Sequence, residues 1–333
     1  MSTHFVCFGE LLLRLSAPGH ERLLQSPRLD VNVGGAEANV AVALAHFGHA
    51  VKLVSALPDN ALGAAACGEM RRHGVDVTPV LRASGRMGLY FLEAGAVHRP
   101  SDVLYDRAGS AFALLPPDHF DWPALLADAE VLHLSGVTPA VSESAAQAAV
   151  HAAQAARERG VRVAFDGNFR GKLWQARGAE PAGVLRELFA RADLLFADHR
   201  DIGLVLGRDF DGDHARAAAA AFAAFPQLAR IATTLRTQHS VDHHDLGAVL
   251  FTRERRIDVE PYAITAIVDR IGAGDAFAAG LLHGLFSGMN DSEALQFALA
   301  AACLKHSIPG DALRMSVAEV GALLGERRYD VRR

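Results

Sequence analysis

The chain has few cysteines, few aromatic residues and no long apolar run. Cys7, Cys67 and Cys303 are its only cysteines, far apart and without a Cys-x-x-Cys pair. This spacing excludes a disulfide framework and a cysteine zinc site, and it is typical of a reducing compartment. The longest hydrophobic stretches, 217–225 and 295–304, are too short to span a bilayer. The first residues do not resemble a signal peptide, so we expect a cytoplasmic protein that does not bind membranes.

A strong charge of either sign is also missing. Lysine and arginine number 33 against 38 aspartates and glutamates, which gives a formal net charge of −5 and no global attraction for nucleic acid. Half of the residues are hydrophobic, enough to build a sizeable core, and this excludes intrinsic disorder. The length would suit two domains, but we expect a single domain over residues 1–333, because one large α/β domain of this size is common.

Short apolar runs alternate with long alanine-rich stretches. We predict buried strands at Val6–Gly9, Lys52–Ser55, Val131–Leu134, Val161–Asp166, Leu194–Ala197, Ile231–Thr234, Ala248–Phe251 and Arg256–Val259. We predict helices at Ala36–Phe47, Ala61–His73, Ser142–Arg159, Pro181–Ala190, Asp213–Phe225, 273–287, 291–305 and 316–325. Strand followed by helix, repeated, predicts an α/β fold with a mostly parallel sheet and helices on both faces.

Two inserted segments, at about 13–33 and 86–112, lack the helical period and interrupt this alternation. Within the second, Met87–Glu93 and Ala96–Pro100 read as a hairpin that turns at Ala94-Gly95. The pattern fits two interpretations equally well. Both segments are ordinary surface hairpins, or together they form a small β-sheet that stands off the main sheet as a lid over a ligand site.

The sharpest local signal is the string VDRIGAGDAF at 268–277. Gly272, Ala273 and Gly274 leave backbone N–H groups unobstructed where an apolar helix begins, and the helix dipole favours negative charge there. We interpret this as a cradle for a phosphate or an oxyanion. Asp275 lies in the first turn, where a carboxylate can take the proton of a hydroxyl that attacks a phosphoryl group. The alternative is a tight turn with an acidic residue at the helix start.

Two other strings offer ligand contacts. Gly34 and Gly35 precede a predicted helix and permit close approach of a ligand, to which Asn39 can donate; the alternative is a helix cap. Asn168 and Arg170 follow a predicted strand, at the end where open α/β sheets bind ligands. The Arg170 guanidinium suits a carboxylate or a phosphate, unless it forms only a surface salt bridge. Neither a Gly-x-Gly-x-x-Gly nor a Walker A string occurs, which argues against a dinucleotide-binding dehydrogenase.

Together these strings resemble the ribokinase-like (PfkB) carbohydrate kinases, which carry an N-terminal Gly-Gly motif and a C-terminal Asp-x-x-Gly-Ala-Gly-Asp motif. The resemblance covers essentially the whole chain, including the lid-like segments. Within the family the sequence is most similar to kinases of 2-keto-3-deoxygluconate, although fructokinases and other sugar-acid kinases share parts of the pattern. The strings that carry this likeness are Gly9-Glu10, Leu13–Ser16, Gly34–Asn39, Leu57–Asn60, Arg86–Tyr90, Arg99–Ser101, Tyr105–Ala108 and Asp269–Asp275.

The resemblance implies a ribokinase-like fold and transfer of the γ-phosphate of ATP, with Mg²⁺, to the terminal hydroxyl of the sugar acid. Asp275 would be the general base, and the amides of Gly272, Ala273 and Gly274 would form the anion hole. The residues implied at the sugar acid are Gly34, Gly35, Asn39, Tyr90, Tyr105, Arg107, Arg170 and Asp311. Those implied at ATP are Asn168, Arg170 and Arg236, with the same three amides. The family also implies a homodimer that pairs through the lid.

One departure concerns the nucleotide. Many family members have a Gly-x-x-Gly turn after the strand equivalent to Ile231–Thr234, whereas residues 234–241 contain no glycine here. ATP as the phosphate donor is therefore implied by family likeness and not by a motif.

Substrate charge separates the candidate functions. A sugar acid would give Arg107 and Arg170 an anion, whereas with a neutral sugar they would be buried without one, which is unfavourable; ATP phosphates are an alternative partner for Arg170. A fructokinase- or ribokinase-like kinase of a neutral sugar therefore stays open as a function. So does a non-catalytic, sugar-binding regulator on a kinase scaffold.

The sixteen histidines raise the question of a metal site, above all at Asp242–Asp245. Adjacent side chains in a loop rarely converge on one ion, and no helical His-x-x-x-His pair supports them. We therefore predict a solvated turn and no protein metal site, with Mg²⁺ held mainly by ATP and water.

Overall fold

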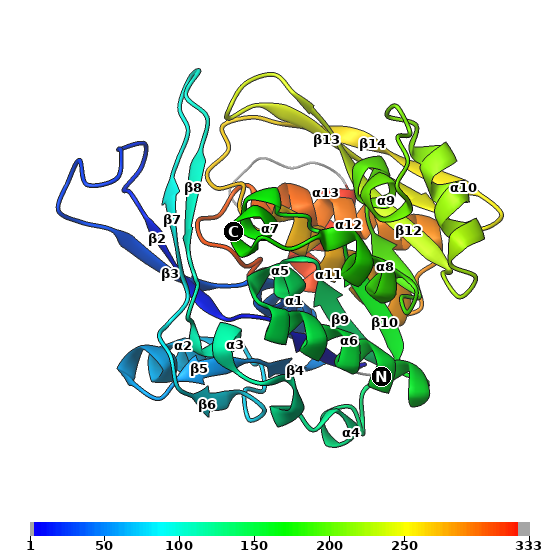
Figure 1. Cartoon of the computed structure of the whole chain (residues 1–333). Coiled ribbons are helices and arrows are strands. Elements are labelled where there is room, and N and C mark those ends of the chain that lie inside the picture. Colours follow the sequence, from blue (N-terminus) through cyan, green and yellow to red (C-terminus); the bar gives the residue numbers. More distant parts are fainter. Residues whose placement is uncertain (1–2, 326–333) are drawn as a thin grey trace.

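The structure is a computed structural model that describes residues 3–325. Its main sheet consists of β1 (His4–Phe8), β4 (Ala50–Val54), β9 (Val131–Ser135), β10 (Arg162–Asp166), β11 (Leu194–Phe196), β12 (Arg230–Gln238), β13 (His244–Phe251) and β14 (Arg256–Ile264). The strand order is β14-β13-β12-β11-β10-β9-β1-β4 (Figure 1). All neighbours from β12 to β4 pair in parallel, and β12, β13 and β14 pair antiparallel. The predicted mostly parallel sheet is confirmed.

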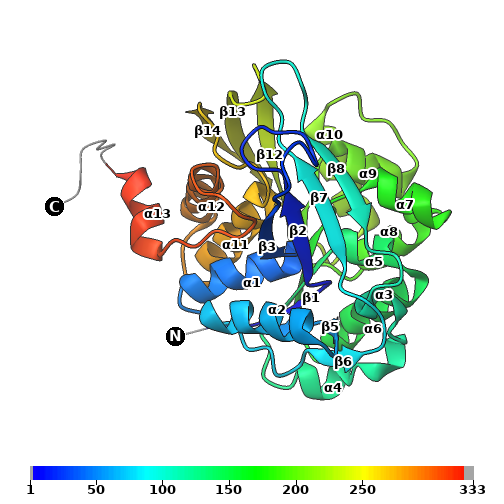
Figure 2. The same cartoon turned by 90° about the vertical axis from the view of Figure 1, so that its left-hand side faces the viewer.

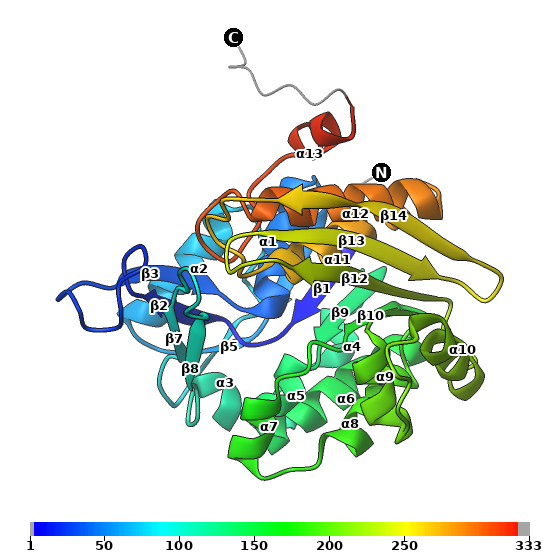
Figure 3. The same cartoon turned by 90° about the horizontal axis from the view of Figure 1, so that it is seen from above.

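Helices cover both faces of this sheet, as predicted (Figure 3). One layer contains α1 (Ala36–His46), α2 (Ala61–Arg72), α11 (Ala273–Phe286), α12 (Asp291–Lys305) and α13 (Val317–Leu324). The other contains α3 (Ala111–Leu114), α4 (Trp122–Leu125), α5 (Val137–Val141), α6 (Glu143–Glu158), α7 (Gly171–Arg177), α8 (Pro181–Phe189), α9 (His199–Leu206) and α10 (His214–Ala224). In β1, Phe5 and Cys7 face the first core and Val6 and Phe8 the second. Burial on both faces explains why such strands read as continuous apolar runs.

Small residues set how closely α11 and α12 pack. A Cβ on Gly280 would lie 2.7 Å from the Cα of Ala298, and one on Gly284 would lie 2.6 Å from the Cβ of Ala294. Larger side chains would push the two helices apart, because these distances are shorter than any ordinary carbon contact. The glycine and alanine content of the last third of the chain therefore fixes the position of α11, the helix that begins at the Gly-Ala-Gly string.

A second, four-stranded sheet stands off the main one (Figures 1 and 2). It consists of β2 (Leu12–Ser16), β3 (Asp30–Gly34), β7 (Leu89–Glu93) and β8 (Asp102–Asp106), in the order β3-β2-β7-β8. The central pair is parallel and the outer pairs are antiparallel. We call this sheet the lid. A short pair of strands, β5 (Ala56–Pro58) and β6 (Leu81–Ala83), lies beside α2.

The predicted hairpin in the lid is wrong in its second strand. Residues 96–100 form a loop, and β8 begins at Asp102. Ala96 and Arg99 close this loop through two mutual backbone hydrogen bonds of 3.0 and 2.8 Å. Pro100 has no N–H group to give to a strand ladder, so regular pairing with β7 starts only after it.

Within residues 3–325, no disulfide bond joins Cys7, Cys67 and Cys303 to one another. No helix in this part of the chain combines the length and the apolarity that crossing a membrane would require.

Candidate active site

A cavity of about 1310 Å³ lies between the lid and the carboxyl ends of the parallel strands. The ends of β10, β11 and β12 contribute to its wall, the lid covers it, and the first turn of α11 points into it. The sequence-predicted residues that line it are Gly35, Asn39, Tyr90, Tyr105, Arg107, Asn168, Arg170, Arg236, Gly272, Ala273, Gly274, Asp275 and Asp311. Gly34 lies outside the lining. Its Cα packs on Asp311, since a Cβ on Gly34 would lie 2.4 Å from Oδ2 of that residue.

The start of α11 requires glycine at position 272. Gly272 is the N-cap with φ of +81°, and a Cβ there would lie 1.7 Å from the carbonyl oxygen of Asp311. By contrast, a Cβ on Gly274 would meet no atom within 4 Å, so this residue faces open space in the cavity. The first N–H groups of a helix have no intrahelical acceptor and favour an anion. Gly272, Ala273 and Gly274 thus line the cavity at a helix start, and their role as a phosphate cradle stays a prediction.

Asp275 lies in the first turn of α11 and faces this cradle. Asn39 on α1 donates from Nδ2 to Oδ2 of Asp275 at 2.7 Å. Burial raises the pKa of Asp275 to about 7, against the opposing effects of the Asn39 hydrogen bond and the positive charge of Arg170. A carboxylate with a pKa near neutrality is a suitable general base, because it is both available and basic enough to take a proton.

Two further carboxylates accompany Asp275, one at the end of β10 and one in the first turn of α9. Asp166, at the end of β10, has a pKa well above its usual range because of burial and the negative charges of Asp275 and Asp201. Burial and the neighbouring Asp198 raise the pKa of Asp201 to about 6. All these side chains line the cavity, and sequence reasoning missed Asp166, Asp198 and Asp201 as site residues. The signal in the sequence was their position at the end of β10 and in the segment that follows β11.

Three arginines, Arg170, Arg236 and Arg270, also line the cavity. None of them forms an ion pair with a carboxylate within the part of the chain that the structure describes. Burial and the charge of Arg236 lower the pKa of Arg270, which shows that these two cations lie near each other. Neighbouring guanidinium groups without an acidic partner form a site for a phosphate or a carboxylate. The sequence analysis missed Arg270 as a site residue, although it lies two residues before Gly272.

The sequence-based argument that a buried Arg107 needs an anionic substrate was wrong, because a carboxylate of the protein already pairs with it. Its Nε donates to Oε2 of the buried Glu10 at 2.6 Å. Glu10 also accepts a hydrogen bond from the Ser110 hydroxyl. Because a protein carboxylate already neutralises Arg107, its burial gives no information on the charge of the substrate.

A buried network connects the lid to the loop before α11. Tyr90 on β7 donates its hydroxyl to Oδ2 of Asp311 at 2.5 Å. Arg14 on β2 lies 3.0 Å from Oδ1 of Asp311 and donates to Oδ2 of Asp269 at 2.7 Å. Asp269 in turn accepts from the backbone N–H of Ile271 at 3.0 Å. The position of the lid and the conformation of the loop before α11 are therefore coupled.

Lys305, at the end of α12, contacts the same loop. Its side chain is fully buried at the end of α12, and Nζ donates to the carbonyl oxygens of Asp269 at 3.3 Å and Ile308 at 3.1 Å. Burial lowers the pKa of Lys305 to about 8, while the charges of Asp269 and Asp311 oppose this shift. The ammonium group thus joins two loops that border the cradle, 269–274 and 308–311.

The remaining predicted residues are placed as follows. The Tyr105 ring lies 6.4 Å from the Tyr90 ring, on the inner face of the lid. Asn168 adopts φ of +35°, and its backbone N–H donates to Oδ1 of Asp166 at 3.1 Å. Arg170 is the N-cap of α7 and is exposed to the cavity.

An α/β sheet, a lid and a helix start that can hold an anion are typical of enzymes that act on small molecules. Comparison with known proteins shows to which family of such enzymes the chain is similar. The model of the pfkB family of carbohydrate kinases matches residues 2–315. A 2-dehydro-3-deoxygalactonokinase from Haloferax volcanii is 35% identical over 324 residues, 97% of each chain. A 2-dehydro-3-deoxygluconokinase from Bacillus subtilis is 27% identical over 318 residues, 93% of this chain and 92% of the relative.

Comparison with solved structures points to the same family of proteins. The crystal structure of a 2-dehydro-3-deoxygluconokinase from Thermotoga maritima superposes with a TM-score of 0.90 at 38% identity, covering 97% of this chain and 100% of that one. The chain belongs to the pfkB family of carbohydrate kinases. It is thus an enzyme of the kinase class with a ribokinase-like fold, as the resemblance implied.

Proposed function

We propose that this kinase transfers the γ-phosphate of ATP to the terminal hydroxyl of 2-keto-3-deoxygluconate, with Asp275 as the general base. The observation that carries the proposal is the position of Asp275, which faces the cavity from the first turn of α11 with a pKa of about 7. The names of the relatives support a 2-keto-3-deoxy sugar acid (the same compounds as 2-dehydro-3-deoxy acids) as the substrate.

The chemical step follows from this geometry. Asn39 fixes Oδ2 of Asp275, so Oδ1 is the oxygen that takes the hydroxyl proton. As the O–H bond breaks, the sugar oxygen forms a bond to the γ-phosphorus, and the bond from that phosphorus to the bridging oxygen of ADP breaks. The backbone amides at 272–274 stabilise the negative charge on the phosphoryl oxygens during transfer.

The cavity also fits an ATP–Mg²⁺ complex. Asp166 and Asp201 offer the oxygen ligands that Mg²⁺ prefers, and burial, together with neighbouring negative charges, raises the pKa of both carboxylates. They would hold Mg²⁺ directly or through water, and the bound ion would reduce the negative charge of the phosphates. We assign Arg236 and Arg270 to the ATP phosphates, together with Asn168.

Arg170 is the candidate for the sugar-acid carboxylate. Its positive charge acts on Asp275 and Asp166, so it lies close to the reaction centre, and no carboxylate of the described chain neutralises it. Tyr90, Tyr105 and Gly35 complete the substrate side, with Asp311 behind Tyr90. Because Glu10 neutralises Arg107, a neutral sugar such as fructose is the second candidate substrate, and Arg170 alone distinguishes the two.

The test is an ADP-release assay with ATP and Mg²⁺ on 2-keto-3-deoxygluconate, 2-keto-3-deoxygalactonate, fructose and ribose. We expect kcat/KM to be highest for a sugar acid. Arg170→Ala should then lose activity on the acid while leaving the slow reaction with fructose unchanged, and the matched variant Arg236→Ala should affect all sugars equally. A preference for fructose or ribose in the wild type would refute the sugar-acid assignment.

A further inference from the structure

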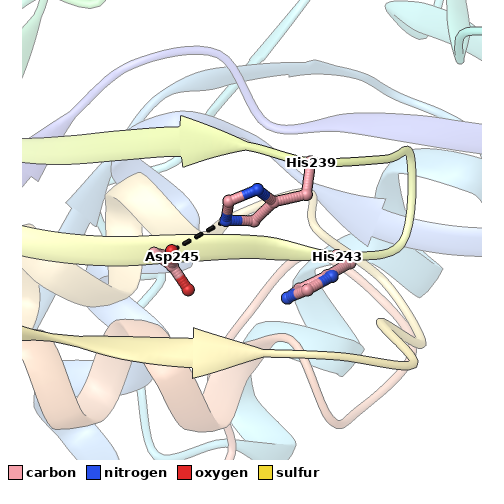
Figure 4. A group of neighbouring side chains, drawn as sticks. All are labelled: His239, His243 and Asp245. Atoms are coloured by element: carbon pink, nitrogen blue, oxygen red, sulfur yellow. Dashed lines mark hydrogen bonds and ion pairs between the residues drawn. The ribbon is translucent and has the colours of Figure 1, made fainter.

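Three potential metal ligands meet at the end of the β12–β13 hairpin, outside the cavity lining. His239, His243 and Asp245 face one another on one side of this hairpin (Figure 4). The register explains why. The backbone N–H of His239 donates to the carbonyl oxygen of His243 at 3.0 Å, so these residues lie opposite each other across the turn. Asp245 is two residues further along β13, where side chains return to the same face.

The side chains are close enough to share one ion. Nε2 of His239 lies 2.7 Å from Oδ2 of Asp245, and the rings of His239 and His243 are 4.6 Å apart. One ligand atom from each of the three residues lies within 4.8 Å of the other two. Small rotations of exposed or half-exposed side chains suffice to bring them to the mutual spacing of ligands around one ion.

Neighbours in sequence do not join this group. The Asp242 carboxylate accepts a hydrogen bond from the Ser240 hydroxyl at 2.7 Å. His244 points into the protein, where its ring lies 4.9 Å from that of His306. The sequence-based prediction of a solvated turn considered only residues 242–245 and did not include His239, which the turn brings next to His243.

We propose that His239, His243 and Asp245 bind one divalent transition-metal ion such as Zn²⁺. Two imidazole nitrogens and one carboxylate oxygen are a donor set that Zn²⁺ accepts, with water completing the coordination. Mg²⁺ is not the expected occupant, because it prefers oxygen ligands throughout. The exposure of His239 gives the ion direct access from solvent.

The same turn contacts the lid. A Cβ on Gly95, in the loop between β7 and β8, would lie 2.8 Å from Cγ1 of Val241. The carbonyl oxygen of Asp242 accepts a hydrogen bond from the backbone N–H of Ile267 at 3.3 Å. A bound ion joins β12 to β13 directly beside this contact, and we expect it to hold the turn in the conformation that meets the lid.

Isothermal titration of the metal-free full chain with ZnCl₂ at pH 7.5 tests the site. We expect one ion per chain at this position, with affinity reduced at least ~10-fold in His243→Ala and in Asp245→Asn, as loss of even a supporting group at a metal site typically causes. His119→Ala removes an exposed histidine far along the chain and is the matched control; its titration should equal that of the wild type.

A second measurement separates binding at the turn from binding elsewhere. Amide hydrogen exchange should slow at His239 and Ser240 when Zn²⁺ is added to the wild type, and it should not change in His243→Ala. Circular dichroism of each variant establishes that it is folded. Equal Zn²⁺ titrations for the wild type and both ligand variants, or no binding by the wild type, would overturn the proposal. Neither result bears on the kinase assignment.

Discussion

The carboxyl group of Asp275 is held in surroundings that favour its protonated form, and this sets the pH range in which it can act. Burial raises its pKa to about 7, so the free enzyme carries the basic form above that pH. We therefore expect kcat/KM to fall about tenfold per pH unit as the pH drops below 7. A pH–rate profile of the wild type with saturating ATP measures this, and a profile that stays flat down to pH 5 would contradict it.

Removing the charge of Asp275 should lower the activity without lowering the stability of the fold. Because the native state binds a proton more tightly than the unfolded chain, the Asp275 contribution to stability decreases as the pH rises from about 4 towards 7. Asp275→Asn should lower kcat at least ~100-fold. At pH 8 it should melt no lower than the wild type, and ATP binding should persist in calorimetry. Asp118→Asn, at an exposed carboxylate, is the control, and wild-type turnover by Asp275→Asn would refute the base assignment.

At this scale, local motifs identified residues that line the cavity, but they identified no long-range partners. Asp275 and Gly272 were found from the string itself, because a helix start with small residues has a chemical meaning in sequence alone. The Arg107–Glu10 pair joins residues 97 positions apart, and no local pattern reveals it. The same limit applies to Asp201, whose role depends on which strands are neighbours in the sheet.

Among the elements, the start of α11 offers a matched pair of glycines. Gly272→Ala places a Cβ 1.7 Å from the Asp311 carbonyl oxygen at a positive φ, so we expect a loss of both stability and activity. Gly274→Ala meets no atom within 4 Å and should fold normally. Its methyl group nevertheless occupies the cradle, so kcat should fall while the melting temperature stays the same. Equal melting temperatures for the two variants would contradict this account.

Lys305 allows a test of the link between α12 and the cradle. Lys305→Met leaves the carbonyl oxygens of Asp269 and Ile308 without their buried donor, which costs about 1–3 kcal/mol of stability. Displacement of the loop should lower kcat by about 10–100-fold, with little change in KM for the sugar. If the ammonium positions the loop, added ammonium or methylammonium chloride should restore part of the rate of Lys305→Ala. Lys172→Met, at an exposed lysine, is the control.

No gain in rate with ammonium, together with a normal kcat in Lys305→Met, would leave Lys305 a purely structural residue. The measurement is therefore kcat as a function of ammonium concentration in both Lys305 variants.

The strands at 131–135 and 162–166 and the long helices match the sequence-based ranges within one or two residues. By contrast, β12, β13 and β14 extend several residues beyond the predicted ranges Ile231–Thr234, Ala248–Phe251 and Arg256–Val259. The helix α9 was missed, although its start carries a capping box between Asp198 and Asp201 and its end carries Gly207 in the left-handed region. The signals for α9 were therefore present at both ends of the helix, but the sequence-based prediction did not use them.

For the whole molecule, the outer face of the lid bears on oligomeric state. Val31, Leu15, Phe91 and Leu104 form one row across all four strands in register. The ends of this row are 59% exposed at Val31 and 54% at Leu104. An apolar row on a sheet face with open edges favours pairing with a second copy.

We therefore expect a homodimer through the lid, as the resemblance implied, with twice the subunit mass in sedimentation equilibrium at micromolar concentration. Leu104→Lys should shift the protein to the monomer because it places a charge in the row. Leu24→Lys, at a residue that is 83% exposed in the loop between β2 and β3, should leave the dimer intact. A wild type that sediments as one subunit would refute the prediction.

The connection from Tyr90 through Asp311 and Arg14 to Asp269 restricts how this scaffold can be redesigned. Grafting the lid of a relative is an attractive way to change sugar preference, because the lid lines the cavity and carries residues that we propose for the sugar. A graft without a cation at position 14 would leave Asp269 and Asp311 buried and uncompensated, at about 3–5 kcal/mol for a broken buried pair. Chimaeras should therefore exchange residues 12–34, 89–106 and 269–311 together, because these segments contain both halves of the network. A crossover point between the segments would separate Arg14 and Tyr90 from Asp269 and Asp311.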